Sequence, residues 1–161
     1  IVKHLRSRKL KNPVVVSPDP GGLKMAHAYA YMLGGGLAIV GKQRKTATEV
    51  EALNLVGDVE GRTCILVDDL ATTAGTLCAA SKLVMDRGAK EVYAAVTHAV
   101  LTEQGIDRLK DSVIKGLVTT DTVPPRDWKG FPVKVLSVAD LLGEGIIRIH
   151  SNQSVTSLFK V

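Results

Sequence analysis

The chain has 161 residues, of which 45% are hydrophobic, 23% are charged and only 4% are aromatic. This length suits one domain with a sizeable core, and so few aromatic residues mean that the core is aliphatic. The net charge of +5 comes from scattered basic residues, which favours an anionic small-molecule ligand over nucleic acid. Because no apolar run approaches the ~20 residues that span a bilayer and no secretory signal is visible, we expect a cytoplasmic protein with neither a membrane nor a nucleic-acid partner.

Short apolar strands and helices alternate through the first half of the chain. The basic cluster from Lys3 to Lys11 is interpreted as the solvated face of a first helix. The remaining predicted elements are a strand at 14–16, a loop at 17–22, a helix at 23–33 closed by glycines 34–36, a strand at 37–40, a flexible basic loop at 41–50 and a turn near 60–61.

The second half continues the alternation. The predicted elements are strands at 64–67, 91–97, 116–119 and 133–136, helices at 75–87 and 103–110, and an exposed loop at 124–128. Gly88 is a suitable C-terminal cap for the helix that precedes it. A final helix begins at Ser137, with Asp140 at the third position of a capping box. Its apolar residues form one stripe, made of Val138, Leu141, Leu142, Ile146 and Ile149.

This order of elements predicts one α/β domain over residues 1–161, with a mostly parallel sheet flanked by helices. The two cysteines, Cys64 and Cys78, fall on a strand and a helix without metal-type spacing, so we expect reduced, buried thiols. Ligands of such sheets bind beyond the carboxyl ends of the strands. The segments 19–22, 42–44 and 68–76 all fall there, and we expect them to share one crevice.

The segment from Val67 to Thr76 is the most informative part of the chain. An apolar strand ends in two acids, and a loop of small residues then leads into a helix. Backbone N–H groups, hydroxyls and the helix dipole can surround one phosphate group at such a helix N-terminus. The loop residues that we expect to bind phosphate are Thr73, Ala74, Gly75 and Thr76, and an ordinary polar helix cap is the alternative.

Asp68 and Asp69 precede this loop, where sugar hydroxyls or a metal would lie. Because successive side chains of a strand point to opposite faces, at most one of the two acids points directly at a given ligand. The other acid can bond to the backbone or to a water-bound metal. An exposed acidic turn is the alternative.

Two further segments could complete an anion site. Asp19 lies in a loop rich in proline and glycine, which can form a second anion nest with the carboxylate as a ligand for a hard cation. Lys42 and Arg44 could close over a polyphosphate and stabilise charge as it develops. A plain turn and a solvated basic loop are the respective alternatives.

These motifs together carry a family resemblance. From about Asn12 to Phe159 the chain resembles the C-terminal half of the ribose-phosphate pyrophosphokinase (PRPP synthetase) family. The matching segments are 16–22, 42–44, 56–59, 67–76, 88–93, 97–98, 119–122 and 154–159. The resemblance implies a type I phosphoribosyltransferase fold within a longer two-domain protein.

The family's enzymes transfer the β,γ-diphosphate of ATP to the C1 hydroxyl of ribose 5-phosphate, with Mg²⁺, and give PRPP and AMP for nucleotide biosynthesis. The resemblance also implies a homo-oligomer, a hexamer built from dimers. It implies that Lys42 and Arg44 are catalytic and that Asp19 helps to place magnesium. The implied ribose 5-phosphate ligands are Asp68, Asp69 and the loop 72–76, and the implied loop for ATP diphosphate contains Asp19, Gly21 and Gly22.

Two other functions stay open. The family usually has an acid where Thr72 stands and a basic residue where Met25 stands, which suits a catalytically weak, regulatory paralogue. A PRPP-sensing transcription regulator on the same fold is the third hypothesis. The 161-residue chain alone is expected to lack the activity, because the family's other half carries much of the ATP pocket.

Overall fold

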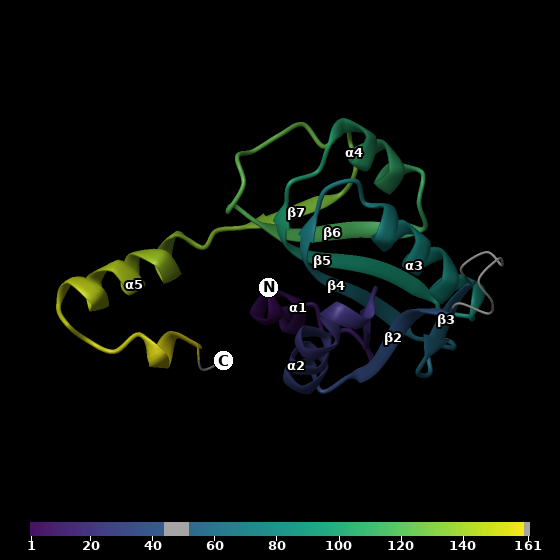
Figure 1. Ribbon diagram of the computed structural model, residues 1–161, viewed down its shortest axis with the longest axis horizontal. Coiled ribbons are helices and arrows are strands. Elements are labelled where there is room, and N and C mark those ends of the chain that lie inside the picture. The colour runs from purple at the N-terminus through teal and green to yellow at the C-terminus, as the bar shows by residue number, and fades with distance from the viewer. Residues whose placement is uncertain (44–51, 160–161) are drawn as a thin grey trace.

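A seven-stranded sheet forms the centre of the molecule, with strand order β3-β2-β1-β4-β5-β6-β7 (Figure 1). The computed structural model describes residues 1–43 and 52–159, with the backbone alone at 42, 43 and 52. Each neighbouring pair of strands is parallel except β2 and β3, which are antiparallel. The strands are β1 (Val14–Ser17), β2 (Gly36–Gln43), β3 (Ala52–Val56), β4 (Thr63–Ala71), β5 (Glu91–Ala99), β6 (Ile114–Thr120) and β7 (Val133–Leu136).

Helices cover both faces of this sheet, and alternate residues of each central strand therefore serve two cores. On one face Val14 and Leu66 pack with side chains of α3 and α4. On the other face Val15 and Ile65 pack with side chains of α1 and α2. The helices are α1 (Val2–Ser7), α2 (Leu23–Leu33), α3 (Gly75–Asp86), α4 (Glu103–Lys110) and α5 (Ala139–His150), with 3₁₀ turns η1 (Pro20–Gly22) and η2 (Thr156–Phe159).

The local signals of the sequence place most elements correctly. The α2 helix ends before Gly34, which adopts a left-handed φ of 64°, and α3 is followed by Gly88 at φ 85°. Both glycines therefore serve as the predicted helix stops. The α4 helix and β7 have the predicted bounds. Cys64 and Cys78 are free thiols; the first is fully buried and the second is half-buried.

All the predicted strands except β7 run farther than predicted, β2 and β4 the most, and β3 is not predicted at all. The β4 strand continues to Ala71 because its last residues pair with β5, with Asp68 opposite Val96 and Ala71 opposite Ala99. The β2 strand continues to Gln43 because it pairs with β3, so residues 41–43 are strand rather than loop. The rest of the predicted loop at 41–50 lies outside the described residues.

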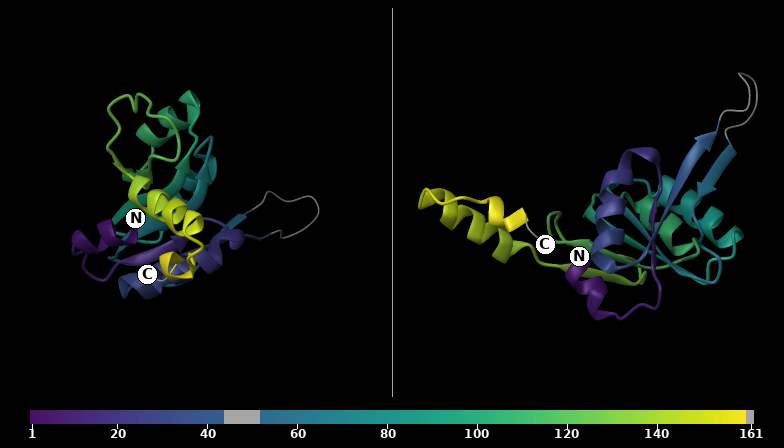
Figure 2. Two further views of the ribbon diagram at one scale, coloured as in Figure 1. Left: turned by 90° about the vertical axis from the view of Figure 1, so that its left-hand side faces the viewer. Right: turned by 90° about the horizontal axis from the view of Figure 1, so that it is seen from below.

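The α5 helix stands apart from the sheet. It projects beyond the body of the protein on the side of the N-terminus, as Figures 1 and 2 show. The predicted stripe is exposed rather than packed: Leu141 is 52% exposed and Ile146 is 68% exposed. Arg148 ties the η2 turn back to the helix through Nη1, which donates to the Ser154 carbonyl at 3.1 Å and to Ser157 Oγ at 2.8 Å.

The start of α5 also differs from the prediction. Val138, not Ser137, is the N-cap residue, and no side chain caps the helix. The Ser137 hydroxyl accepts from the Ala139 N–H at 3.2 Å, and Asp121 Oδ1 accepts from the Val138 N–H at 2.9 Å. Among the described helices, none has the length and apolar character that crossing a membrane requires.

Candidate functional site

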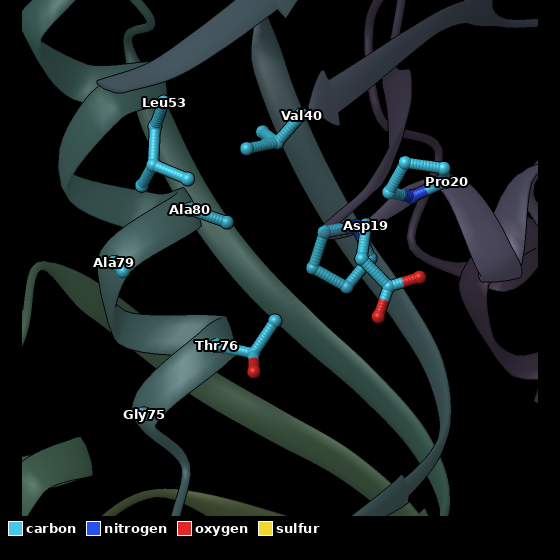
Figure 3. Close-up of a pocket in the computed structure, with 9 residues that line it drawn as sticks. Asp19, Pro20, Val40, Leu53, Gly75, Thr76, Ala79 and Ala80 are labelled. Carbon is cyan, nitrogen blue, oxygen red and sulfur yellow. The ribbon is translucent and has the colours of Figure 1, made fainter. Parts of the chain in front are cut away.

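The candidate site lies at the carboxyl ends of β1 and β4. These two strands are neighbours, and successive strands continue outward from them in opposite directions, which is the place where open α/β sheets bind ligands. A cavity of about 670 Å³ opens there, between the loop after β1 and the first turns of α3. Figure 3 shows Asp19 and Thr76 on opposite sides of it.

The loop after β4 leads into the N-terminus of α3, where backbone N–H groups have no partner within the helix. Ala74 is the N-cap residue of α3, at a left-handed φ of 55°, and no side chain caps the helix. Within the described residues, the first helix bond at this end runs from the Cys78 N–H to the Ala74 carbonyl. The N–H groups of residues 75–77 therefore have no intrahelical partner, as at any helix start. Thr73 and Thr76 add exposed hydroxyls beside them.

Asp68 faces this loop. Both line a small cavity of about 80 Å³, formed by Asp68 and residues 70–77. Asp68 is half-buried, whereas Asp69 is exposed and lies outside the lining of both cavities. The structure thus brings Asp68 together with the loop 72–76 and leaves Asp69 aside, in line with the expected opposite orientation of neighbouring strand residues.

The electrostatics of Asp68 are unusual. The pKa of its carboxyl group is raised to about 6, mainly by burial and also by the nearby carboxylates of Asp19 and Asp69, while a hydrogen bond from the Asp69 N–H opposes the rise. That N–H lies 3.0 Å from Asp68 Oδ1. A carboxyl group whose charged form is disfavoured in the free protein is well suited to meet hydroxyl donors or a cation.

The loop after β1 holds Asp19 in place. Asp19 Oδ1 accepts from the Gly22 N–H at 3.1 Å, and the Ser17 hydroxyl donates to the Asp19 carbonyl at 2.6 Å. A Cβ atom on Gly22 would lie 2.8 Å from Ser17 Oγ, so the loop needs glycine there. Gly21 and Gly22 shape the loop but do not line the large cavity; Gly21 instead lines a hollow beside α2.

The Asp19 carboxylate lies near enough to Asp68 to act on its charge, so the two acids are candidates for a magnesium site that substrate completes. Mg²⁺ is usually held by one or two carboxylates together with phosphate oxygens and waters. The repulsion between the two carboxylates, which contributes to the raised pKa of Asp68, is what a cation between them would relieve. In the described part of the chain, no group of three or more His, Cys, Asp or Glu side chains is arranged as a metal site.

Of the two predicted basic site residues, the structure describes only the backbone of one. Lys42 lies near the end of β2, where it pairs with Leu53 of β3, and Arg44 lies outside the described residues. Leu53 and Val40 both line the large cavity, so the ends of β2 and β3 border the site.

Sequence analysis missed the contribution of α4. The Thr102 N–H donates to the Thr72 carbonyl at 2.9 Å, and Arg108 Nη1 donates to the Thr73 carbonyl at 3.1 Å. The Thr102 hydroxyl caps α4 by accepting from the Gly105 N–H at 3.1 Å. A threonine before a helix is a recognisable cap, but nothing local connects it to a loop 30 residues earlier in the chain.

The parallel sheet, its helices and the loop after β4 define a type I phosphoribosyltransferase fold. An adenine phosphoribosyltransferase from Thermoanaerobacter pseudethanolicus shares this fold with a TM-score of 0.50 and 20% identity, over 84% of this chain and 77% of that one. The phosphoribosylpyrophosphate synthetase structure from Mycobacterium smegmatis is much more similar. Its TM-score is 0.82 and its identity 36%, over 94% of this chain and 51% of that one.

The family follows from the sequence itself. Residues 44–160 match the phosphoribosyl synthetase-associated domain, and the chain belongs to that family. A ribose-phosphate pyrophosphokinase from Gloeobacter violaceus is 47% identical over 162 residues, which cover 99% of this chain and 49% of the relative. The chain spans about half the length of the curated relatives it matches. The predicted resemblance and fold class are confirmed.

Proposed function

We propose that this chain is the ribose-5-phosphate-binding half of a ribose-phosphate diphosphokinase. The complete enzyme would transfer diphosphate from ATP to the C1 hydroxyl of ribose 5-phosphate, giving PRPP and AMP for nucleotide biosynthesis. One observation carries the proposal: the uncapped N-terminus of α3 and the Asp68 carboxyl line the same small cavity. The names of the relatives support it.

The geometry suits ribose 5-phosphate because it offers N–H donors for the phosphate group and a carboxylate acceptor for the sugar hydroxyls. The free N–H groups of the loop 72–76 and the α3 dipole would hold the 5′-phosphate. The Asp68 carboxylate would accept hydrogen bonds from the ribose hydroxyls, which fixes the sugar for attack by its C1 hydroxyl. Phosphoryl transfer needs mainly such positioning together with charge stabilisation.

The other residues have supporting parts in this proposal. Asp19 would hold magnesium with Asp68, and the ion, when bound, would neutralise charge on the transferring diphosphate. Lys42 and Arg44 would stabilise that charge as it develops. Assembly of the complete protein into a homo-oligomer and its use of ATP are further predictions from the family.

The proposal is tested by calorimetric titration of the 161-residue chain. We expect ribose 5-phosphate to bind at millimolar concentration or below, inorganic phosphate to bind more weakly, and ribose not to bind, because most of the interaction is with the phosphate group. No heat with ribose 5-phosphate at millimolar concentration would contradict the proposal. We also expect no PRPP from ATP and ribose 5-phosphate with magnesium when this chain is the only protein present.

A catalytically weak paralogue is the second candidate, and Thr72 favours it. Thr72 is exposed and lines the small cavity, where the family usually has an acid. Under this hypothesis Thr72→Asp should raise the affinity for ribose 5-phosphate tenfold or more when magnesium is present, and not without it. An unchanged or lower affinity would favour the active enzyme.

A further inference from the structure

The α4 helix contacts the back of the phosphate loop. Two successive carbonyl groups of the loop point at it: the Thr72 carbonyl accepts from the Thr102 N–H, and the Thr73 carbonyl accepts from the Arg108 guanidinium. The Thr102 hydroxyl lies a further 3.4 Å from the same Thr72 carbonyl oxygen. These contacts are the only polar ones that α4 and its cap make to this loop among the described residues.

The orientation of these carbonyl groups determines where the next N–H groups point. A trans peptide unit is planar, so its C=O and N–H bonds point in opposite directions. When the Thr72 and Thr73 carbonyls face α4, the N–H groups of Thr73 and Ala74 face away from it. Thr73 and Ala74 both line the small cavity, so N–H groups that face away from α4 are available to a ligand there.

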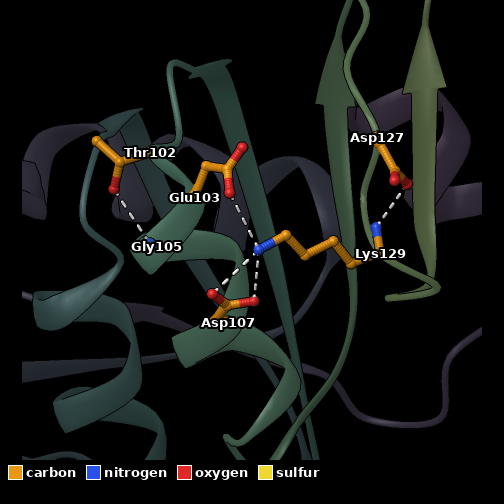
Figure 4. A network of polar contacts seen from close by, with 6 residues as sticks. All are labelled: Thr102, Glu103, Gly105, Asp107, Asp127 and Lys129. Carbon is orange, nitrogen blue, oxygen red and sulfur yellow. Dashed lines mark hydrogen bonds and ion pairs between the residues drawn. The ribbon is translucent and has the colours of Figure 1, made fainter.

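The α4 helix is a firm support for this arrangement. Ile106 is 3% exposed and Leu109 fully buried, which anchors the inner face of the helix in the core. On the outer face Lys129 Nζ lies 2.9 Å from Asp107 Oδ1 and 3.4 Å from Glu103 Oε2, as Figure 4 shows. The helix is therefore held from both sides, independently of any ligand.

Glycine at position 105 lets the helix come close enough. A Cβ atom there would lie 2.7 Å from the Thr72 carbonyl oxygen and 3.2 Å from the Thr73 carbonyl carbon. Arg108 Nη1 would lie 3.7 Å from a Cβ atom placed on Gly75, so the guanidinium charge is also next to the start of α3. A positive charge at that place favours an anion in the cavity.

We propose that Arg108 is a positioning residue of the phosphate site. It holds the Thr73 carbonyl on α4, so that the Ala74 N–H is directed at the 5′-phosphate before the ligand arrives, and Gly105 provides the close approach that this needs. The inference rests on the proposed function, because the ligand is taken to be a phosphate ester. Arg108 itself need not touch the ligand.

The test is a titration of the isotopically labelled 161-residue chain with ribose 5-phosphate and with inorganic phosphate, followed by the amide signals of residues 73–76. We expect Arg108→Ala to weaken both ligands about tenfold, which corresponds to ~1.4 kcal/mol, and to move the Ala74 amide signal before any ligand is added. Arg108→Lys should restore part of the affinity, because it keeps a charged donor. Lys110→Ala removes the same charge from the exposed side of α4 and should leave the affinity unchanged.

A second variant keeps the test decisive if Arg108→Ala folds poorly. Gly105→Ala retains the arginine but pushes on the Thr72 carbonyl, and it should weaken both ligands as well. Wild-type affinity in Arg108→Ala and Gly105→Ala, or an equal loss in Lys110→Ala, would overturn the inference while leaving the proposed function intact. If the wild-type chain binds neither ligand, the proposed function itself is wrong.

Discussion

At the scale of single residues, the position of Asp68 lowers the stability of the ligand-free protein. It lies at the carboxyl end of a buried strand, near the carboxylates of Asp19 and Asp69, and these surroundings raise its pKa from 3.8 to about 6. The charged form is therefore less stable in the folded chain than in the unfolded one. A ligand that donates hydrogen bonds, or a cation, would reverse that penalty.

We expect Asp68→Asn to stabilise the free protein at pH 8 by about 1 kcal/mol, less than the full pKa shift implies because the side chain is only half-buried. The gain should shrink as the pH falls from about 6 toward 4, since the wild-type carboxyl then takes up its proton in the folded state. Urea unfolding at pH 8, 6, 5 and 4 measures this. Asp69→Asn, at an exposed position, should change stability by less than ~0.5 kcal/mol, and a pH-independent gain in Asp68→Asn would contradict the prediction.

Gly57 is a second residue that its surroundings constrain. It adopts a φ of 117°, and a Cβ atom there would lie 2.7 Å from the Ala38 Cβ and from the Leu37 carbonyl oxygen. We expect Gly57→Ala to cost about 2–3 kcal/mol in thermal or urea unfolding. Gly143→Ala is the control, since the residue is in α5 and, apart from its chain neighbours and the adjacent helix backbone, no described atom lies within 4 Å of the added methyl group. It should be neutral or stabilising by up to ~1 kcal/mol.

At the scale of elements, α4 and α5 differ in what they contribute. The α4 helix has only eight residues, yet it buries Gly105, Ile106 and Leu109 and supports the loop after β4 through the hydrogen bond from Arg108 to the Thr73 carbonyl. The α5 helix has twelve residues and buries none of them. Both helices have an amphipathic pattern, but the pattern measures a capacity to pack and not the presence of a partner.

The same substitution in the two helices tests this difference. We expect Ile106→Ala to cost about 2–4 kcal/mol, because the residue is 3% exposed and its truncation leaves a cavity. Ile146→Ala should stay within ~0.5 kcal/mol of wild type, because Ile146 is 68% exposed and alanine is the better helix former. Urea unfolding followed by the fluorescence of Trp128 compares them, and equal losses would show that α5 is packed in solution.

At the scale of the whole molecule, the helices on both faces of the sheet shield its central strands from solvent. Cys64 on β4 is fully buried, and burial raises the pKa of its thiol to about 11. Cys78 on α3 is half-buried, with Sγ 3.6 Å from the Arg108 carbonyl oxygen. The reactivity of the two thiols therefore measures different motions. Cys78 measures local opening, and Cys64 measures the opening of the sheet.

We expect Cys64 to react with a thiol reagent only as fast as the whole chain unfolds, and Cys78 to react faster. Labelling of Cys64→Ser and Cys78→Ser variants, followed by mass spectrometry, separates the two rates. A small amount of urea should accelerate Cys64 in proportion to the global unfolding constant. Labelling of Cys64 at the rate of Cys78 in the absence of urea would show that the sheet opens locally.

The sequence by itself determined the elements with strong local signals, the α/β class, and the position of the proposed phosphate loop between Asp68 and α3. Periodicity, glycine stops and the acid–threonine–glycine order each act over a few residues. A local signal is therefore enough to predict these features. The length of β4, the existence of β3, the support of the loop by Thr102 and Arg108, and the exposure of α5 were decided only in the tertiary structure. Each of these features depends on contacts with residues far away in the chain. Strand pairing, close approach and burial arise only from such contacts, so no local pattern predicts them.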